Sequence, residues 1–508
     1  MMSPIARGLA ASCLFSVSAT LAQADLAAQD VWADWRAYLS SSGYEVSGTE
    51  AMSGDVLTIT GMTMTMDMPE SSGSLVVGID SLTFTENGDG TVSVGFPASM
   101  PIRITGVNEK DEPFDMTLDY SQTGLSMVVS GSPEDMTYNY TAASMGLAMS
   151  SFLVNGAAVP ADTARGSASL GNVTGTTRMM AGAVRNYAQS FQSTGLSYDV
   201  FFRDPEGQGQ VTIAGQSQSL NLEGVSNLPE EMNTENLSAM IKAGFAGSGS
   251  ITFGPGATKM TFQEEGESFD YDSTSQGGVL KVGLGPSGLE YDLSQSMVTV
   301  NVMGSEIPLP VSLSMAEMGL RLAFPTVASD ADQDFALALN LSDFSMSDLL
   351  WSLFDPAQQL PRDPATLRIV TSGKAKLTAD VFDPEVAASL EASGAAPGEL
   401  SALTISDLTL RAAGAELTGS GDFTFDNTDK VTFDGMPKPT GALNLKLVGG
   451  NGLLDKLVAM GLLPEDQAMG ARMMMGLFAV PGTEPDTLNS KIEINDQGHV
   501  LANGQRIQ

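Results

Sequence analysis

The chain has 508 residues, and its 60 Asp and Glu against 24 Lys and Arg give a formal net charge of −36. Such an acidic chain repels nucleic acids and anionic lipid headgroups, because both bind proteins through clustered Lys and Arg. Since 42% of the residues are hydrophobic and 17% are charged, the composition also excludes a disordered acidic tail. We therefore expect a folded protein without a nucleic-acid partner.

The first 24 residues have the layout of a secretory signal peptide. A short start carrying Arg7 precedes a weakly apolar run over residues 9–21, and the tripeptide 22–24 is a small-x-small cleavage sequence. An uncleaved anchor is disfavoured, because hydroxyl groups interrupt the run and a spanning helix needs about 20 predominantly apolar residues. The sequence predicts cleavage between Ala24 and Asp25, a periplasmic location and no membrane span after cleavage.

The cysteine count excludes a disulfide within the chain. Cys13 is the only cysteine and lies inside the predicted signal peptide. A lipoprotein reading would use Cys13, but it would leave almost no apolar segment before the lipid-bearing residue. Residues 25–508 would then contain no thiol, and their stability must come from buried apolar surface.

Alternation of apolar and polar residues is the main secondary-structure signal, and it predicts strands with one apolar face. Clusters of Gly, Asn, Asp and Ser separate the runs, as antiparallel meanders require. Pro308 and Pro310 cannot donate ladder hydrogen bonds, so their strand is expected at an edge or rim. The predicted apolar faces are Met62/Met64/Met66/Met68, Val92/Val94/Phe96, Phe114/Met116/Leu118/Tyr120, Leu280/Val282/Leu284, Leu289/Tyr291/Leu293, Val298/Val300/Val302, Ile307/Leu309/Val311/Leu313, Phe335/Leu337/Leu339/Leu341, Phe423/Phe425, Val431/Phe433 and Leu443/Leu445/Leu447.

Helical periodicity is limited to a few short segments. We expect helices over residues 26–39, 229–245, 349–354, 453–458 and 465–478, the third of them capped by Ser345 with Asp348. Three of these helices directly follow a predicted strand. The predicted fold is therefore α+β and mostly β, with long antiparallel meanders forming an elongated curved sheet and short helices at its rims. Residues 25–508 would form one elongated region, composed of two related halves at 25–246 and 247–508.

Two stretches carry a family resemblance. One is the helix with Trp32 and Trp35, followed by the segments 43–46 and 53–57, and the other is the hairpin 491–504. These stretches resemble an uncharacterised family of exported bacterial proteins, domain of unknown function 2125. The resemblance covers nearly all of the chain after residue 24 and implies an envelope location without a known activity. The alternating strands also look similar to the groove-forming AsmA and TamB type of envelope proteins, which usually keep a membrane anchor.

Candidate catalytic residues are scarce. His499 is the only histidine and lies beside Gly498 in the predicted C-terminal hairpin, where a surface role is more common than that of a base. No serine sits in a G-x-S-x-G elbow, and residues 247–250 (Gly-Ser-Gly-Ser) and 419–421 (Gly-Ser-Gly) are interpreted as turns. A pair of carboxylates could serve a glycosidase, but acidic surfaces are general in this chain. We predict a protein that is not an enzyme and has no catalytic or cofactor-binding residues.

Two patterns could hold a metal ion. Asp330, Asp332 and Asp334 have the spacing of a calcium loop, but its obligatory Gly and closing Glu are absent, which favours a solvated loop. The series Met62 to Met68 and the cluster 473–475 could bind Cu(I), a soft ion. Because Met also fills cores, and the chain has 29 of them, packing is the preferred interpretation and no metal site is predicted.

Two classes of function agree with these observations. The first is a non-enzymatic periplasmic protein that shelters an apolar ligand, in the first place lipid, in a β-sheet groove. The alternative is a structural or interaction protein of the cell envelope with a filled core and no ligand. The sequence does not separate them, because a groove wall and a core face have the same period of two.

The signal peptide gives the first testable prediction. The protein isolated from its native host should begin at Asp25 and fractionate with the soluble periplasm, because signal peptidase removes the segment that ends at Ala24. Intact-mass measurement checks this expectation. A mass that retains residues 1–24, or membrane association that resists an alkaline wash, would contradict it.

Overall fold

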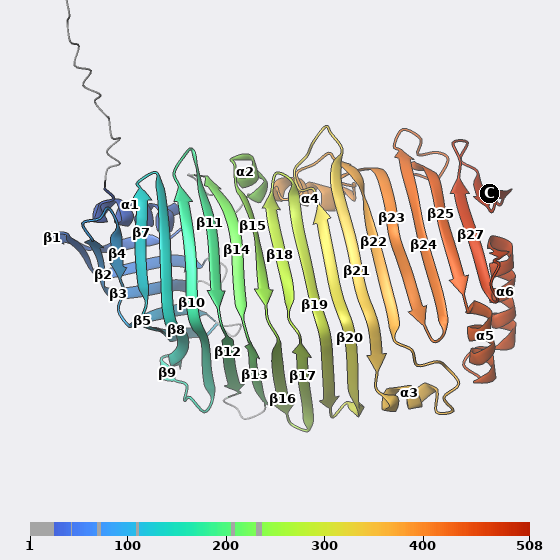
Figure 1. Cartoon of the computed structure of the whole chain (residues 1–508), viewed down its shortest axis with the longest axis horizontal. Coiled ribbons are helices and arrows are strands. Elements are labelled where there is room, and N and C mark those ends of the chain that lie inside the picture. The colour runs from blue at the N-terminus through green and yellow to red at the C-terminus, as the bar shows by residue number, and fades with distance from the viewer. Residues whose placement is uncertain (1–24, 42, 69–72, 108–110, 205–208, 230–235) are drawn as a thin grey trace, which may run out of the picture.

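The computed structural model describes residues 25–41, 43–68, 73–107, 111–204, 209–229 and 236–508, so the predicted signal peptide up to Ala24 lies outside the described residues. Antiparallel strands form one extended sheet, and short helices lie at its ends and rims (Figure 1). The predicted α+β, mostly β class is therefore confirmed. The helices in the described ranges are α1 (Ala28–Ser41), α2 (Leu237–Lys242), α3 (Asp348–Phe354), α4 (Pro384–Ser393), α5 (Gly450–Ala459) and α6 (Glu465–Phe478).

The strands follow one another across the sheet in nearly the order of the chain, each hydrogen-bonded antiparallel to its neighbours. They are β1 (Glu45–Ser53), β2 (Val56–Met68), β3 (Gly73–Glu86), β4 (Val92–Gly95), β5 (Ser99–Val107), β6 (Pro113–Thr123), β7 (Ser126–Ser132), β8 (Asp135–Val154), β9 (Ala157–Ala158), β10 (Ala164–Met180), β11 (Val184–Ser193), β12 (Leu196–Arg203), β13 (Gly209–Ser217), β14 (Leu220–Pro229), β15 (Ala246–Phe253), β16 (Gly256–Glu264), β17 (Glu267–Ser275), β18 (Gly278–Gly285), β19 (Gly288–Gly304), β20 (Ile307–Phe324), β21 (Gln333–Met346), β22 (Ala365–Leu377), β23 (Gly398–Ala412), β24 (Ala415–Asp426), β25 (Lys438–Val448), β26 (Val480–Pro481), β27 (Thr487–Ile494), β28 (Val500–Ala502) and β29 (Gln505–Arg506).

A line of interruptions, here called the crease, crosses the sheet at right angles to the strands. Between β10 and β19, each crossing of the sheet by the chain is interrupted near its middle (Figure 1). The interruptions divide this part of the sheet into two ladders of hydrogen-bonded strands, and both ladders are joined to β10 at one side and to β19 at the other. One ladder is β11–β14–β15–β18 and the other is β12–β13–β16–β17. Several crease residues have a left-handed backbone, with φ values of +43° at Asn172, +105° at Gly277, +49° at Met297 and +51° at Asp343.

The crease changes the phase of the apolar alternation within a strand. In β19 the apolar residues occupy odd positions up to Leu293 and even positions from Val298 onward, and Met297 lies between the two runs. The pairing skips Met297 of β19 and Ala316 of β20 together, so the register does not shift: Ser296 pairs with Glu317 and Val298 with Met315. The left-handed backbone at Met297 therefore changes the phase of the alternation without a β-bulge. The sequence runs Leu289/Tyr291/Leu293 and Val298/Val300/Val302 therefore belong to one strand, whereas the sequence pattern predicts two.

One face of the sheet carries an unbroken line of apolar side chains, here called the central row. Its members pair directly from strand to strand, so they lie side by side on the same face. The central row is Leu57, Phe84, Val94, Met127, Tyr140, Gly175, Phe191, Leu222, Ile251, Leu280, Leu293, Leu320, Leu339, Ile369, Leu408, Gly419 and Leu445.

Two glycines on this apolar face, Gly175 and Gly278, do not interrupt it, because an aromatic ring on a neighbouring strand lies over each of them. A Cβ atom added to Gly175 would lie 2.2 Å from Cζ of Tyr140, its partner in the ladder. The same close approach joins Gly278 to Phe253, at 2.7 Å from Cζ. A side chain at these glycines would displace the rings, so the glycines keep the apolar surface smooth and continuous.

The opposite face carries the charges. Lys281, Asp292 and Arg321 are sequence neighbours of central-row residues, so they point away from the apolar face. Lys281 Nζ lies 3.7 Å from Asp292 Oδ2, and the Arg321 guanidinium lies 3.3 Å from Glu290 Oε1. Exposed pairs like these add little stability, about 0–1 kcal/mol each. Their main effect is to place the charged side chains on one face of the sheet. The opposite face, which carries the central row and is here called the dry face, stays apolar.

The N-terminal end of the sheet curls around α1, and this is where the buried core lies. Strands β2 and β3 lie behind β7 and β8 in Figure 1, and their side chains share one buried cluster with those of β8, β10 and β11. Val31 and Trp32 of α1 fill the centre of this curl, against Leu82 and Phe84 of β3. The central-row residues Leu57, Phe84 and Val94 are therefore buried.

Beyond the curl, the side chains of the apolar face are more exposed to solvent than those inside it. From Phe191 to Leu445 no side chain of the central row is fully buried, and each is shielded in part by its neighbours in the row. Val282, on the same face, is 45% exposed. The described helices at the far end, α5 and α6, pack against each other, close to β24 and β27 respectively. The sheet thus has a closed core at one end and a half-exposed apolar face along the rest.

Most predicted elements are present, with four corrections. Helices α1, α3, α5 and α6 are confirmed. The strand of Pro308 and Pro310, β20, pairs with both β19 and β21 and so is not an edge strand; the two prolines lie in its first residues, before the pairing with β21 begins. Helix α2 spans only residues 237–242 of the predicted 229–245, because residue 229 ends β14 and residues 230–235 lie outside the described residues. Helix α4, capped by Asp383 and ended by a left-handed Gly394, was not predicted.

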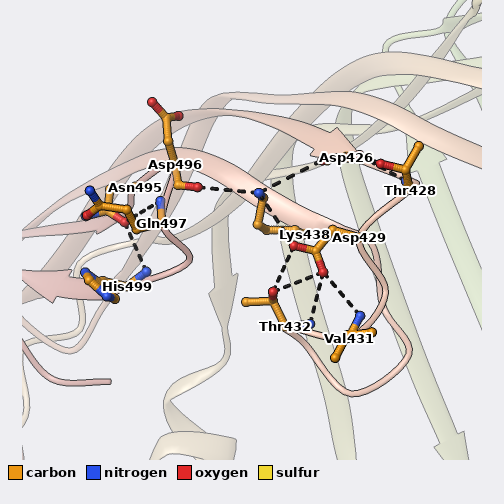
Figure 2. Close-up of polar contacts among 10 residues, drawn as sticks. All are labelled: Asp426, Thr428, Asp429, Val431, Thr432, Lys438, Asn495, Asp496, Gln497 and His499. Atoms are coloured by element: carbon orange, nitrogen blue, oxygen red, sulfur yellow. Dashed lines mark hydrogen bonds and ion pairs between the residues drawn. The ribbon is translucent and has the colours of Figure 1, made fainter.

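The other two corrections concern local hydrogen bonding. The N-cap of α3 is Ser347, because Ser345 is still paired in β21. Val431 and Phe433 form no strand, and Val431 is 90% exposed. The Asp429 carboxylate accepts the backbone N–H groups of Val431 and Thr432 at 3.2 and 3.1 Å and so forms a turn (Figure 2). The division at residue 247 stays a prediction; this residue lies within β15.

The contrast between the closed end and the open face gives a stability prediction. Leu82→Ala should lower the free energy of unfolding by about 2–5 kcal/mol, since Leu82 is 0% exposed and its loss leaves a cavity. Leu293→Ala should cost clearly less, because Leu293 is only half-buried. Urea unfolding of lipid-free protein compares the two variants. Equal losses would mean that the open face is packed like a core.

Candidate functional site

The main apolar cleft lies inside the curl, beside α1; we call it the inner cleft. Its volume is about 390 Å³, within the range of small-molecule sites. The walls come from α1 and from strands on both sides of the curl, so the cleft exists only because the sheet turns back on itself. Its lining includes Trp35, Leu39, Met62, Met64, Val77, Ile79, Phe96, Met100, Met127, Tyr138, Tyr140 and Tyr187.

Helix α1 forms one wall because its sequence gives it an apolar side and anchored ends. The Asp30 carboxylate accepts the Ala27 N–H at 3.0 Å, and Glu86 of β3 accepts the Ala28 N–H at 2.9 Å. Both bonds satisfy backbone donors that the first turn of a helix leaves free. The Trp35 ring meets the edge of Phe84 with 5.5 Å between ring centroids, which fixes the inner side of the helix.

A buried polar cluster closes one end of the inner cleft. Asp34 of α1 is 7% exposed, and the Tyr138 hydroxyl donates to its Oδ2 at 2.8 Å. The Arg185 guanidinium of β11 forms an ion pair with the same carboxylate. A buried carboxylate needs such partners, because an unpaired charge away from water is costly. The cluster joins α1 to β8 and β11 and so holds the curl closed.

The two tyrosines of the cluster are neutral hydrogen-bond donors. Burial raises the pKa of Tyr138 far above its usual value, and the neighbouring Asp34 charge raises it further. Burial likewise raises the pKa of Tyr187. The Arg185 guanidinium lies beside the Tyr187 oxygen and lowers this pKa in part. The hydroxyl is buried, Tyr187 lines the inner cleft, and the hydroxyl proton has no acceptor among the described residues. The cluster thus combines an ion pair, in which the charges of Asp34 and Arg185 compensate each other, with one hydroxyl that is free to donate.

A second hollow lies on the same apolar face at the crease. It has a volume of about 520 Å³ and is lined by side chains from both ladders, among them Leu220, Phe253, Val300 and Met318. A third hollow, about 690 Å³, is lined mostly by Ser, Gln, Gly and Thr along the crease, and its lining includes no charged side chain. We place the candidate site in the inner cleft, because only there do apolar walls meet a buried polar cluster.

The sequence candidates for metal binding are not brought together. Among the described residues, no three His, Cys, Asp or Glu side chains converge in a way that could hold a metal ion. Met62 belongs to the buried core and Met64 lines the inner cleft, whereas Met473 is 71% exposed on α6. The three aspartates of the calcium-like pattern have separate partners, Asp330 with Lys376, Asp332 with Ser401 and Asp334 with Lys374.

His499 lies in the turn between β27 and β28, as predicted, but it is half-buried rather than exposed. Its backbone N–H donates to Asn495 Oδ1 at 3.0 Å, which shapes the turn (Figure 2). The two Gly-Ser stretches are not turns. Residues 247–250 lie in β15 and residues 419–421 in β24, where the ladder brings neighbouring backbones close to the glycines. Asp25, at the predicted cleavage point, is exposed just before α1.

Sequence reasoning missed the polar cluster. Asp34 carries the only signal: it lies three residues after Val31 and four before Tyr38, at the spacing of the helix side that packs inward. Arg185, Tyr138 and Tyr187 are ordinary members of alternating strands. Their meeting with Asp34 depends on the curl, across 104 and 151 residues of chain.

The fold defines a class: an extended antiparallel sheet with one dry face, closed at one end around a helix. Residues 255–504 match the family model described as an uncharacterized protein conserved in bacteria (DUF2125). The resemblance to this family is therefore confirmed for this part of the chain. The match does not reach Trp32 and Trp35, so the predicted coverage of nearly the whole chain is not supported.

The other comparisons add no relative. No curated protein matches the chain, and no solved structure matches it. The likeness to AsmA and TamB type proteins therefore stays an expectation. None of the helices in the described part of the chain has both the length and the apolar character needed to cross a bilayer.

The polar cluster gives a prediction with a matched control. Tyr138→Phe should lower the free energy of unfolding by about 1.5–3 kcal/mol, because the buried Asp34 carboxylate loses one of its donors. Tyr140→Phe removes the same atom from a half-buried ring of the same strand and should change stability by no more than about 0.5 kcal/mol. Thermal and urea unfolding measure both. A Tyr138→Phe protein as stable as the control would show that the bond does not hold the curl.

Proposed function

We propose that this chain is a non-enzymatic protein of the bacterial envelope that shelters an apolar ligand, in the first place lipid, on the dry face of its sheet. The observation that carries this proposal is the central row. It places apolar side chains or glycine in register from Leu57 to Leu445, without one charged residue. A soluble protein rarely leaves a contiguous apolar surface of this extent partly open unless that surface binds something.

The geometry suits a long hydrocarbon chain better than a compact ligand. The row runs at right angles to the strands, and neighbouring strands are about 4.8 Å apart, so its part outside the curl is far longer than any drug-sized ligand. The inner cleft and the crease hollow lie on this same face. A sheltered acyl chain would gain about 0.8 kcal/mol for each buried CH₂ group. The acidic composition repels anionic membrane surfaces, which favours uptake of single lipid molecules over adhesion to a bilayer.

The alternative, a structural or interaction protein of the envelope without a ligand, rests on the closed end alone. There α1 fills the curl as a core would. The periplasmic location, the absence of enzymatic activity and the removal of residues 1–24 are part of the proposal and rest on the sequence pattern. An envelope protein as partner remains compatible with either function.

A charge placed on either face of one strand tests the proposal. Leu293→Asp puts a carboxylate in the middle of the central row, and Ser294→Asp puts the same group on the opposite face, one residue away. Protein purified from its native host should carry lipid detectable by native mass spectrometry. Leu293→Asp should lose most of this lipid, because a buried charge opposes apolar contact. Ser294→Asp should retain it.

Either of two results would contradict the proposed function. One is wild-type protein that carries no lipid from its native host, which leaves the structural alternative. The other is equal lipid loss in both variants, since a specific dry face cannot respond to a charge on its wet side. Circular dichroism of both variants confirms that the sheet is intact before lipid is compared.

A further inference from the structure

One polar group of the inner cleft has an unused hydrogen-bond donor: the hydroxyl of Tyr187. The residue is 6% exposed, and the Arg185 guanidinium, which can only donate, lies beside its oxygen. The hydroxyl proton itself has no acceptor among the described residues. A buried donor left unpaired destabilises the folded state, so such groups usually have a function. Tyr187 lines the inner cleft, and its ring lies 5.2 Å from that of Tyr38, between centroids.

The surroundings indicate which kind of group would satisfy this donor. Asp34 and Arg185 neutralise each other beside the cleft, so the cluster has no net charge to offer. An anionic headgroup would enter without a free counter-charge and would lose its hydration. An uncharged acceptor, such as an ester or amide carbonyl, needs only one hydrogen bond. Apart from Thr177 and Gln189, the other lining side chains are apolar or aromatic and fit a hydrocarbon chain attached to that carbonyl.

We propose that the inner cleft binds an uncharged acylated lipid, with the Tyr187 hydroxyl donating a hydrogen bond to its acyl carbonyl oxygen. This inference rests on the proposed function and adds the chemical class of the ligand and the position of its polar end. The acyl chain lies along Met62, Met64 and Met127 toward the central row. Met side chains suit this role, because flexible thioethers adapt to a chain without a fixed shape.

A pair of ligands that differ at the carbonyl tests the hydrogen bond directly. The probes are 1-monopalmitoylglycerol, an ester, and 1-O-hexadecylglycerol, an ether of the same chain length without the carbonyl. Lipid-free wild-type protein should bind the ester about fivefold more tightly, the effect of one net hydrogen bond. Tyr187→Phe should bind both probes alike. The control Tyr120→Phe, at a half-buried tyrosine of β6 that does not line the inner cleft, should keep the preference for the ester.

A second readout separates a binding role from a structural one. Because Tyr187→Phe removes an unpaired buried hydroxyl, the melting temperature of lipid-free protein should stay unchanged or rise. A clear fall would make the hydroxyl a structural partner and overturn the inference, as would an ester preference that survives in Tyr187→Phe. Wild-type protein that binds both probes equally would overturn the carbonyl contact while the proposed function stands. Binding of neither probe, in protein that carries lipid from its host, would move the ligand out of the inner cleft.

Discussion

The structure depends on a single constraint: every long strand must keep its apolar side chains on one face of the sheet from end to end. The crease would break this rule, because it interrupts the alternation near the middle of the strands. In β10 and β19 left-handed residues, Asn172 and Met297, stand at the interruption. The pairing register does not shift across them, and in β19 the alternation resumes in the opposite phase. The dry face therefore continues across both ladders, and the charged pairs stay on the other side.

The curl at the N-terminal end of the sheet encloses the same dry face. At the N-terminal end the sheet turns back, α1 inserts Val31 and Trp32 into the turn, and Asp34 is fixed there by Tyr138 and Arg185. This arrangement makes one end of the dry face a closed core and leaves the inner cleft beside it. A ligand that enters the cleft would meet apolar walls continuous with the central row, so core and proposed binding surface are parts of one surface.

Particular elements show why the sequence predicted the sheet well and the site poorly. Strands such as β21 and β25 were predicted because alternation is local, and α6 because its helical period is local as well. Val431 and Phe433 fit a strand pattern but lie in a turn, since the Asp429 side chain competes for their backbone N–H groups. The phase change inside β19 is visible in the sequence but predicts two strands, because a left-handed residue within a strand and a turn between strands interrupt the alternation alike.

The sequence by itself determined the mostly β class, the antiparallel order of the strands and the existence of a face free of charge. These properties follow from contacts between residues close in the chain, and side-chain alternation records them directly. Only the tertiary structure decided that this face curls around α1, which residues close the inner cleft and that the Tyr187 hydroxyl stays unpaired. The physical reason is distance along the chain: Asp34 and Arg185 are 151 residues apart, and no local pattern encodes their meeting.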